Sequence, residues 1–208
     1  RLAELAGAHI HIQHVTTAGG VDIIRQAKKR GARVTAESAP HYFSLTEDAV
    51  SGFNTNAKMN PPLREKEDVQ AIIEGFRDGT LDCIATDHAP HTPTEKRVEF
   101  TDAPFGIVGL ETSLALTITH LVKPGHISLE HAIRLLSLGG ARACQIDAGS
   151  LHIGAGADIA IFDPEASWTV NTLEFASKSR NSPFLGQTLQ GRVMYTLHNG
   201  KIVYNATQ

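Results

Sequence analysis

The sequence has few cysteines, little excess charge and no long apolar run, and each shortage excludes a class of protein. Two cysteines in 208 residues cannot form a disulfide framework, so we expect reduced thiols in a cytoplasmic protein. A formal net charge of −3 argues against a general nucleic-acid or anionic-membrane binder. The apolar runs are far shorter than the roughly 20 residues of a membrane-spanning helix, so no membrane partner is expected.

Several common catalytic motifs are also missing. The sequence has no Walker loop, no Gly-x-Ser-x-Gly elbow and no Cys-x-x-Cys pair. Residues 154–157 (Gly-Ala-Gly-Ala) precede an expected strand instead of a helix, so they predict a turn and not a nucleotide-binding loop. The sequence opens at Arg1 inside an expected helix, without an initiator Met and without a charged n-region followed by an apolar h-region.

The composition that remains is typical of a globular α/β protein. Hydrophobic residues make up 41% and charged residues 20% of the chain, which is enough to build a core. Apolar strands and amphipathic helices alternate, as in βαβ units with a parallel sheet. We expect strands at residues 9–15, 33–37 and 82–86, and helices at 2–6, 20–30, 46–50, 65–78, 109–121 and 129–138. Residues 92–103 are polar and aperiodic, which predicts a long loop of the kind that covers functional sites.

The C-terminal part has a different pattern. Short strands are expected at residues 158–162, 167–170, 192–197 and 201–204, and residues 199–200 (Asn-Gly) are a hairpin signal. We therefore expect two domains, an α/β part at residues 1–149 and a β part at residues 150–208. The α/β part has three strands, whereas a closed (β/α)₈ barrel needs about 250 residues. It is an incomplete barrel or a small open sheet, unless further strands precede Arg1.

Residues 86–91 (Thr-Asp-His-Ala-Pro-His) are the most informative stretch for chemistry. They directly follow the third expected strand, at the end where sites assemble in parallel α/β folds. Asp87 and the two imidazoles of His88 and His91 suit a metal ligand, a general base and a substrate contact. The alternative is structural: Asp87 caps a turn and both histidines are surface residues.

Residues 9–14 (His-Ile-His-Ile-Gln-His) place a further histidine near the same edge. In an extended strand, His14 shares one face with Ile12, while His9 and His11 lie on the other. His14 is at the C-terminal end, where it can ligate a metal beside Asp87. We interpret His9 and His11 as packing residues because they lie deeper in the strand and have the opposite parity.

Two other segments offer weaker candidates. Asn60 precedes two prolines that fix an extended turn, so its amide either points toward the site or belongs to a plain connector. His41 follows the second expected strand, and for this residue the structural interpretation is favoured. Cys83 lies inside the third expected strand, which indicates an inert core thiol.

Taken together, these motifs resemble a known family. Residues 11–17, 58–64, 85–91 and 106–112, with residues 156–163 and 178–184 in the tail, are similar to the class I bacterial dihydroorotases of the amidohydrolase superfamily. The resemblance runs through essentially all of the chain in the right order. It implies the C-terminal part of a TIM-like (β/α)₈ barrel, namely its last three βα units, plus part of a small β-sandwich. The chain would then be a C-terminal fragment, inactive alone because it supplies at most two protein ligands of the metal pair. The first-strand His-x-His-x-Arg, the bridging Lys or Asp and one further metal-binding His would lie upstream of Arg1.

The resemblance also implies a chemistry and a set of residue roles. It implies a binuclear Zn²⁺ site with His14 and Asp87 as ligands, and Asp87 as general base and acid. Asn60 and His91 would contact the carboxylate or ring of the substrate, and Pro104 and Gly106 would flank a backbone segment that resembles the family's pyrimidine-binding stretch. The reaction would interconvert dihydroorotate and N-carbamoyl-L-aspartate in pyrimidine biosynthesis.

Other members of the superfamily remain alternatives. Allantoinase, hydantoinase and dihydropyrimidinase share the metal chemistry, although residues 60–64 (Asn-Pro-Pro-Leu-Arg) and 89–91 (Ala-Pro-His) favour a carboxylated ring. A non-catalytic scaffold that binds aspartate transcarbamoylase is a different kind of alternative. A homodimer is also compatible with the resemblance.

Overall fold

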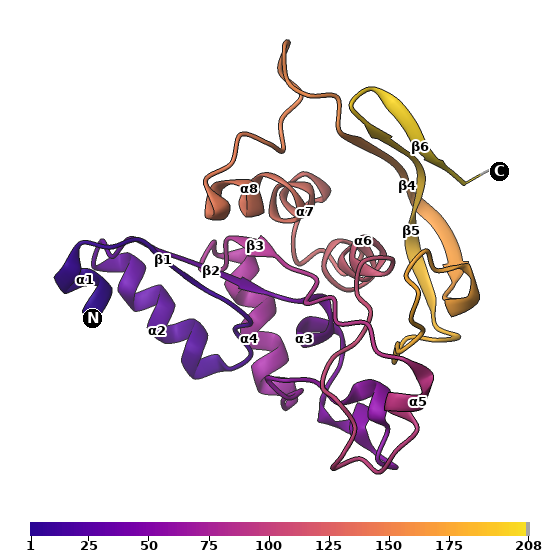
Figure 1. Ribbon diagram of the computed structural model, residues 1–208. Coiled ribbons are helices and arrows are strands. Elements are labelled where there is room, and N and C mark those ends of the chain that lie inside the picture. Colours follow the sequence, from indigo (N-terminus) through magenta and orange to yellow (C-terminus); the bar gives the residue numbers. More distant parts are fainter. Residues whose placement is uncertain (207–208) are drawn as a thin grey trace.

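A computed structural model describes residues 1–206 and contains two sheets with helices around them (Figure 1). The first sheet is parallel, in the order β1-β2-β3, and the second is antiparallel, in the order β4-β5-β6. The strands are β1 (Ile10–Ile12), β2 (Val34–Ser38), β3 (Cys83–Ile84), β4 (Ile159–Thr169), β5 (Thr188–His198) and β6 (Lys201–Asn205). The α-helices are α1 (Leu2–Ala6), α2 (Ala18–Lys29), α3 (Pro40–Ser44), α4 (Lys66–Arg77), α5 (Pro93–Lys96), α6 (Ser113–Thr117), α7 (Leu129–Leu136) and α8 (Leu138–Cys144). Short 3₁₀ turns are η1 (Glu47–Val50), η2 (Thr55–Ala57) and η4 (Thr172–Glu174), and η3 (Ile118–Val122) is a π-helix.

The parallel sheet has one apolar face and one polar face. Its register pairs Ile12 with Ala36 and Glu37 with Cys83. Alternation along each strand then sends Ile12, Ala36 and Ile84 into an apolar cluster with side chains of α2, α4 and α7. The opposite face carries polar groups and a thiol, contributed by His11, Thr35, Glu37 and Cys83.

The helices pack on the apolar face because their apolar residues recur at helical spacing. Val21 and Ile24 are the buried residues of α2, which begins where the Thr17 hydroxyl accepts a hydrogen bond from the backbone N–H of Gly20. In α4, Ile72 and Phe76 are completely buried. Burying a side chain of this size contributes about 2–3 kcal/mol, so this face holds the three strands in place.

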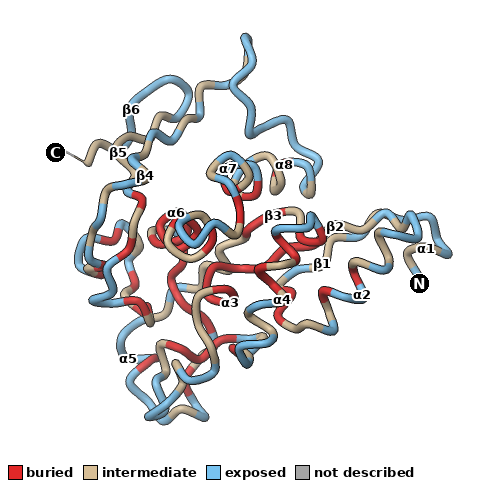
Figure 2. Tube along the Cα trace, turned by 180° about the vertical axis from the view of Figure 1, so that it is seen from behind, coloured by how far each residue is buried: buried red, intermediate tan, exposed pale blue. Residues whose placement is uncertain are grey.

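A second apolar cluster joins the antiparallel sheet to the α/β part. It contains Tyr42 and Met59 from the α/β part and Phe184 and Leu189 from the C-terminal part. The backbone N–H of Gln190 also donates to the Thr119 hydroxyl in η3. Buried residues concentrate around β2, β3 and α6, while α1 and the β5–β6 hairpin end are exposed (Figure 2). The separate domains that we predicted at residues 1–149 and 150–208 therefore share a core.

The expected hairpin is present, and its turn has the backbone that its sequence predicts. Asn199 and Gly200 both have positive φ, 49° and 74°, as a type I′ turn requires. The two strands that we expected at residues 158–162 and 167–170 are instead one strand, β4, with an irregular register between Asp163 and Ser167. Within residues 1–206, no helix combines the length and the apolar character needed to cross a bilayer.

Three expected elements differ in the α/β part. The first strand ends at Ile12, before His14, whose positive φ of 54° is incompatible with an extended strand. The segment at residues 46–50 is a 3₁₀ turn, and its Thr46 hydroxyl donates to Asp48 instead of capping the helix. The helix expected from residue 109 starts only at Ser113 and continues as the π-helix η3.

Two helices were not expected from the sequence. Helix α5 lies inside the polar segment at residues 92–103, and a capping box between Thr92 and Glu95 starts it. Helix α8 follows α7 after a break at Ser137. Its Gly139-Gly140 pair is unfavourable for a helix interior, which explains why periodicity did not reveal it.

Candidate active site

Three polar side chains meet where the parallel strands end. His14 follows β1, His41 lies in α3 directly after β2, and Asp87 follows β3. The His14 Nε2 atom lies 3.7 Å from Asp87 Oδ1, and His41 Nε2 lies 3.9 Å from Asp87 Oδ2. The carboxylate therefore presents one oxygen to each imidazole at the C-terminal edge of the sheet, where ligand sites form in parallel α/β folds.

The backbone at two of these residues is unusual. His14 and Asp87 both have left-handed φ angles, 54° and 47°, which non-glycine residues rarely adopt and which concentrate at functional sites. Neighbouring hydrogen bonds impose this geometry at His14. The Val15 N–H donates to Glu37 O at 3.0 Å, and the Ser38 hydroxyl donates to Val15 O at 2.7 Å. Both hydrogen bonds hold Val15, the residue that directly follows the strained position.

His41 is the most deeply buried member of the group. Its residue is 1% exposed, and burial, with a smaller effect from His14, lowers its pKa to about 3. The imidazole is therefore neutral at pH 7, which is the form that ligates metals. Its ring packs edge-on against Tyr42, with centroids 4.1 Å apart. The Tyr42 hydroxyl donates to Pro61 O at 2.7 Å, which ties the turn after Asn60 to α3.

The electrostatics of Asp87 suit proton transfer. Partial burial raises the pKa of its carboxyl group, and the nearby Glu37 carboxylate raises it further, against the opposing effect of His14. A carboxyl group placed beside the reacting atoms can accept a proton and return it.

The donor set fits a metal ion. His41 Nε2, which faces Asp87, is a buried atom for which residues 1–206 offer no hydrogen-bond partner. Such orphaned groups are costly unless something binds them. Zinc–ligand bonds of about 2.0–2.2 Å place two donors on one ion no more than about 4 Å apart. Both distances to Asp87 are within that limit.

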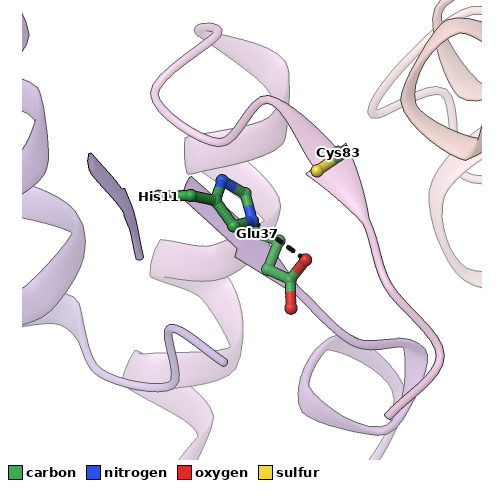
Figure 3. Close-up of side chains that lie close together, drawn as sticks. All are labelled: His11, Glu37 and Cys83. Atoms are coloured by element: carbon green, nitrogen blue, oxygen red, sulfur yellow. Dashed lines mark hydrogen bonds and ion pairs between the residues drawn. The ribbon is translucent and has the colours of Figure 1, made fainter. Parts of the chain in front are cut away.

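A second group of potential ligands lies on the polar face of the sheet. His11, Glu37 and Cys83 hold their donor atoms within 4.8 Å of one another (Figure 3). A hydrogen bond of 3.0 Å from His11 Nε2 to Glu37 accounts for much of this proximity. Burial raises the pKa of the Cys83 thiol to about 12, so the metal-binding thiolate is disfavoured.

The position of His11 corrects an expectation. We expected it to face away from His14, but both imidazoles lie against Glu37, at 3.0 Å and 3.4 Å. The strand ends before His14, so the alternation that separated the two faces does not reach it. Glu37 itself was not singled out from the sequence, because a carboxylate inside a strand has no local signature.

The other predicted residues lie around the loop after Asp87. His91 donates its backbone N–H to Asn181 Oδ1, and its Nε2 pairs with Phe105 O at 2.8 Å. Gly106 has φ 112°, and a Cβ there would lie 2.4 Å from that of Ala89. Its N–H donates to Lys58 O, and its carbonyl accepts from Asn181.

Asn60 and Pro104 complete that set. Asn60 is exposed at the turn that Tyr42 holds. The carbonyl of Pro104 accepts a hydrogen bond from Lys96. The structure therefore brings His14 and Asp87 into direct proximity, while it joins His91 to Gly106 through Asn181 and leaves Asn60 at the surface.

His91 also lines a positively charged cavity. The cavity has a volume of about 270 Å³, and its wall includes Lys96, Arg97, Arg180 and Asn181 but no acidic residue. Such a wall favours an anionic group.

His41 and Asn181 are the residues whose importance the sequence analysis underestimated. His41 was given a structural interpretation, yet it lies beside Asp87. The available signal was its position directly after a parallel strand, the same signal that identified Asp87. Asn181 lies in a distant segment that the resemblance included, and no local pattern predicts its contact with residues 89–106.

The chain is similar to known dihydroorotases along nearly its whole length. It is 53% identical over 205 residues to the dihydroorotase of Citrifermentans bemidjiense, covering 99% of this chain and 48% of that protein. It is 54% identical over 205 residues to the dihydroorotase of Clostridioides difficile, with the same coverage. The chain thus spans about half the length of the curated relatives it matches.

Solved structures of related hydrolases have the same fold. Dihydropyrimidinase from Brevibacillus agri superposes with a TM-score of 0.93 at 27% identity, covering 100% of this chain and 47% of that one. L-hydantoinase from Arthrobacter aurescens gives a TM-score of 0.91 at 31% identity, covering 98% and 46%. The model of the amidohydrolase family matches residues 2–203. With a match of this extent, the chain belongs to the amidohydrolase family.

Proposed function

We propose that the whole protein containing this chain is a zinc-dependent dihydroorotase, which interconverts dihydroorotate and N-carbamoyl-L-aspartate. The observation that carries the proposal is the placement of His14 and His41 on the two oxygens of Asp87. The choice of substrate is supported by 53% identity to a dihydroorotase over nearly the whole chain, against 27% to a dihydropyrimidinase of similar fold.

In this proposal the chain holds part of a metal site and performs the proton transfers. His14, His41 and Asp87 hold the metal, and a binuclear zinc centre supplies a nucleophile at neutral pH and polarises the ring carbonyl. Asp87 accepts the proton of the attacking water and returns it to the leaving ring nitrogen. The position of Asp87 beside His14 and His41, at the C-terminal edge of the sheet, supports this role.

The proposal assigns substrate contacts to the neighbouring loops. His91 and Asn60 bind the substrate carboxylate, and the cationic wall around His91 supports a negatively charged ligand. Pro104 and Gly106 shape the site beside the ring, because their backbone hydrogen bonds are already used inside the protein.

We infer that the architecture is the C-terminal part of a TIM-like (β/α)₈ barrel, with residues 150–208 forming part of a β-sandwich. The parallel order of β1, β2 and β3, with His14, His41 and Asp87 at their C-terminal ends, supports this inference. The further ligands of a binuclear site then come from other strands of the whole protein. We further propose a cytoplasmic enzyme, either a homodimer or a partner of aspartate transcarbamoylase.

The second candidate is a hydantoinase or dihydropyrimidinase, which the structural similarity favours. The test is to assay the whole protein on dihydroorotate, hydantoin and dihydrouracil, before and after removal of metal by a chelator. We expect hydrolysis of dihydroorotate alone, its loss on chelation and its recovery with Zn²⁺. Turnover of hydantoin or dihydrouracil in place of dihydroorotate would favour the second candidate. A whole protein that binds no metal and turns over none of the three substrates would favour the non-catalytic scaffold.

A further inference from the structure

A continuous line of polar contacts runs along the polar face of the sheet to His14. Gln145 Nε2 lies 3.4 Å from His9 Nδ1, and His9 Nε2 lies 3.2 Å from Thr35 Oγ1. The same hydroxyl lies 2.9 Å from His11 Nδ1, and His11 Nε2 lies 3.0 Å from Glu37 Oε2 (Figure 3). Every link crosses between elements, so the line depends on the fold and not on one segment.

The direction of each hydrogen bond follows from the carboxylate at the end. An ionised carboxylate only accepts, so His11 donates from Nε2, and in the tautomer with its proton on Nε2 the ring accepts at Nδ1. Thr35 then gives its single proton to His11 and accepts from His9 Nε2. His9 in turn accepts at Nδ1 from the amide nitrogen of Gln145, which can only donate. All five groups are compatible with this one direction, in which Glu37 Oε2 accepts from His11.

The remaining oxygen of Glu37 is directed at His14. Glu37 Oε1 and His14 Nδ1 lie 3.4 Å apart, and neither atom has a hydrogen-bond partner within residues 1–206. Glu37 is 7% exposed, so water does not easily replace a missing partner. If Nδ1 carries the proton toward Glu37, then His14 presents the lone pair of Nε2 toward Asp87 Oδ1 at 3.7 Å. Two acceptors that face each other at that distance leave a position that suits a metal ion.

We propose that Glu37 is a positioning residue for the metal site: it fixes the His14 ring with Nδ1–H toward Glu37 and Nε2 toward the metal, while His11 holds the carboxylate in place. This inference rests on the proposed function. A carboxylate behind a ligating histidine orients the ring and raises its basicity, and its loss typically weakens metal binding about 10–100-fold.

The test measures the Zn²⁺ affinity of the whole protein by competition with a chelator of known affinity. Glu37→Gln keeps the size of the side chain and removes its charge, and we expect Zn²⁺ to bind about 10–100-fold more weakly. The visible absorption of the Co²⁺-loaded protein should shift, because the geometry of His14 changes. Glu111→Gln is the matched control: this partly buried carboxylate accepts from the backbone and hydroxyl of Ser177, and the variant should keep its Zn²⁺ affinity and its Co²⁺ spectrum.

A second variant covers the case in which Glu37→Gln does not fold. His11→Asn leaves Glu37 present but removes its support, and Zn²⁺ binding should weaken by less than in Glu37→Gln. If Glu37→Gln folds, an unchanged Zn²⁺ affinity and an unchanged Co²⁺ spectrum in that variant would overturn this inference and leave the proposed function intact. If Glu37→Gln does not fold, the same result in His11→Asn would do so. A wild-type protein that binds no metal would overturn the proposed function together with it.

Discussion

At the scale of single residues, the left-handed backbone at His14 and Asp87 determines which substitutions are informative. A β-branched or bulky residue is strongly disfavoured at φ near 50°, whereas asparagine adopts that conformation readily. Loss of activity in an alanine variant at either position would therefore mix chemistry with backbone strain. Asparagine separates the two effects.

We predict that Asp87→Asn in the whole protein lowers kcat at least about 100-fold, the usual contribution of a general acid–base group. The fold should persist because asparagine tolerates the φ of 47° at this position. Steady-state kinetics, with circular dichroism as the control for folding, check this prediction. A variant with more than a tenth of wild-type kcat would remove Asp87 from the proton transfers.

Lys96 gives a prediction about pH. Burial, with a smaller effect from Lys58, lowers its pKa from 10.5 to about 8. Between pH 8 and pH 10.5, Lys96 is protonated in the unfolded chain and largely deprotonated in the folded one. The free energy of unfolding therefore rises with pH in this range, by up to about 1.4 kcal/mol per pH unit. Below pH 8 both states are charged, and this dependence disappears.

Denaturant titrations of wild type and Lys96→Met between pH 7 and pH 10.5 measure that dependence. The wild-type curve should gain stability relative to the variant above pH 8, and the exposed Lys66→Met should follow wild type. Parallel curves for wild type and Lys96→Met would show that Lys96 has an ordinary pKa.

At the scale of elements, adjacent glycines in α8 should respond oppositely to the same substitution. A Cβ on Gly139 would lie 2.2 Å from Asp82 O, at the start of β3, whereas a Cβ on Gly140 would meet nothing within 4 Å. Gly139→Ala should therefore lower the free energy of unfolding by about 1–3 kcal/mol. Gly140→Ala should raise it by about 0.5–1 kcal/mol, since alanine is the better helix former. Denaturant titration of both variants checks the pair, and equal effects would show that α8 does not approach β3 this closely.

A single lysine fastens the segment after α5. Lys58 Nζ donates to the carbonyls of Phe100, Thr101 and Ala103 at 2.6, 2.9 and 2.6 Å. It also lies 4.7 Å from the centroid of the Phe105 ring, close enough for a cation–π contact. This segment is therefore anchored, although its polar sequence predicts a loop.

We predict that Lys58→Met lowers the free energy of opening this segment by about 2–4 kcal/mol, because charged hydrogen bonds are lost and buried carbonyls remain unpaired. Hydrogen–deuterium exchange at residues 97–103 should accelerate in the variant. Lys123→Met, which breaks an exposed ion pair with Glu165, should leave exchange in that segment unchanged. Equal protection of residues 97–103 in wild type and Lys58→Met would contradict the anchoring role.

Periodicity predicted the elements whose packing agrees with local preference. Helices α2 and α4 match their expected ranges closely because their apolar faces cover the sheet. The predicted and observed elements differ where a tertiary contact overrides the local preference of the sequence. Helix α8 needs a glycine at position 139 because α8 packs closely on β3 there, and β1 stops early because His14 turns toward Asp87. The capping box that starts α5 was readable from Thr92 and Glu95 but lay in an otherwise polar segment.

At the scale of the whole molecule, the sequence predicted only those residues of the candidate site that directly follow a parallel strand. The position of Asp87 after a short apolar strand was enough to bring it together with His14. His41 follows from the same rule, but its burial, which keeps the ring neutral, emerges only from packing against Tyr42. The contribution of Glu37 depends on the register between β1 and β2, which no local pattern encodes.

The two cysteines differ in burial, so their alkylation can report whether the protein is folded. Cys144 is exposed and Cys83 is buried, with burial raising the pKa of the Cys83 thiol to about 12. A brief pulse of iodoacetamide should therefore alkylate Cys144 in native molecules and reach Cys83 only in molecules that have lost the sheet. Mass spectrometry of the two peptides would then count native and unfolded molecules in one sample. Rapid alkylation of Cys83 under native conditions would show that β3 opens while the rest of the protein stays folded.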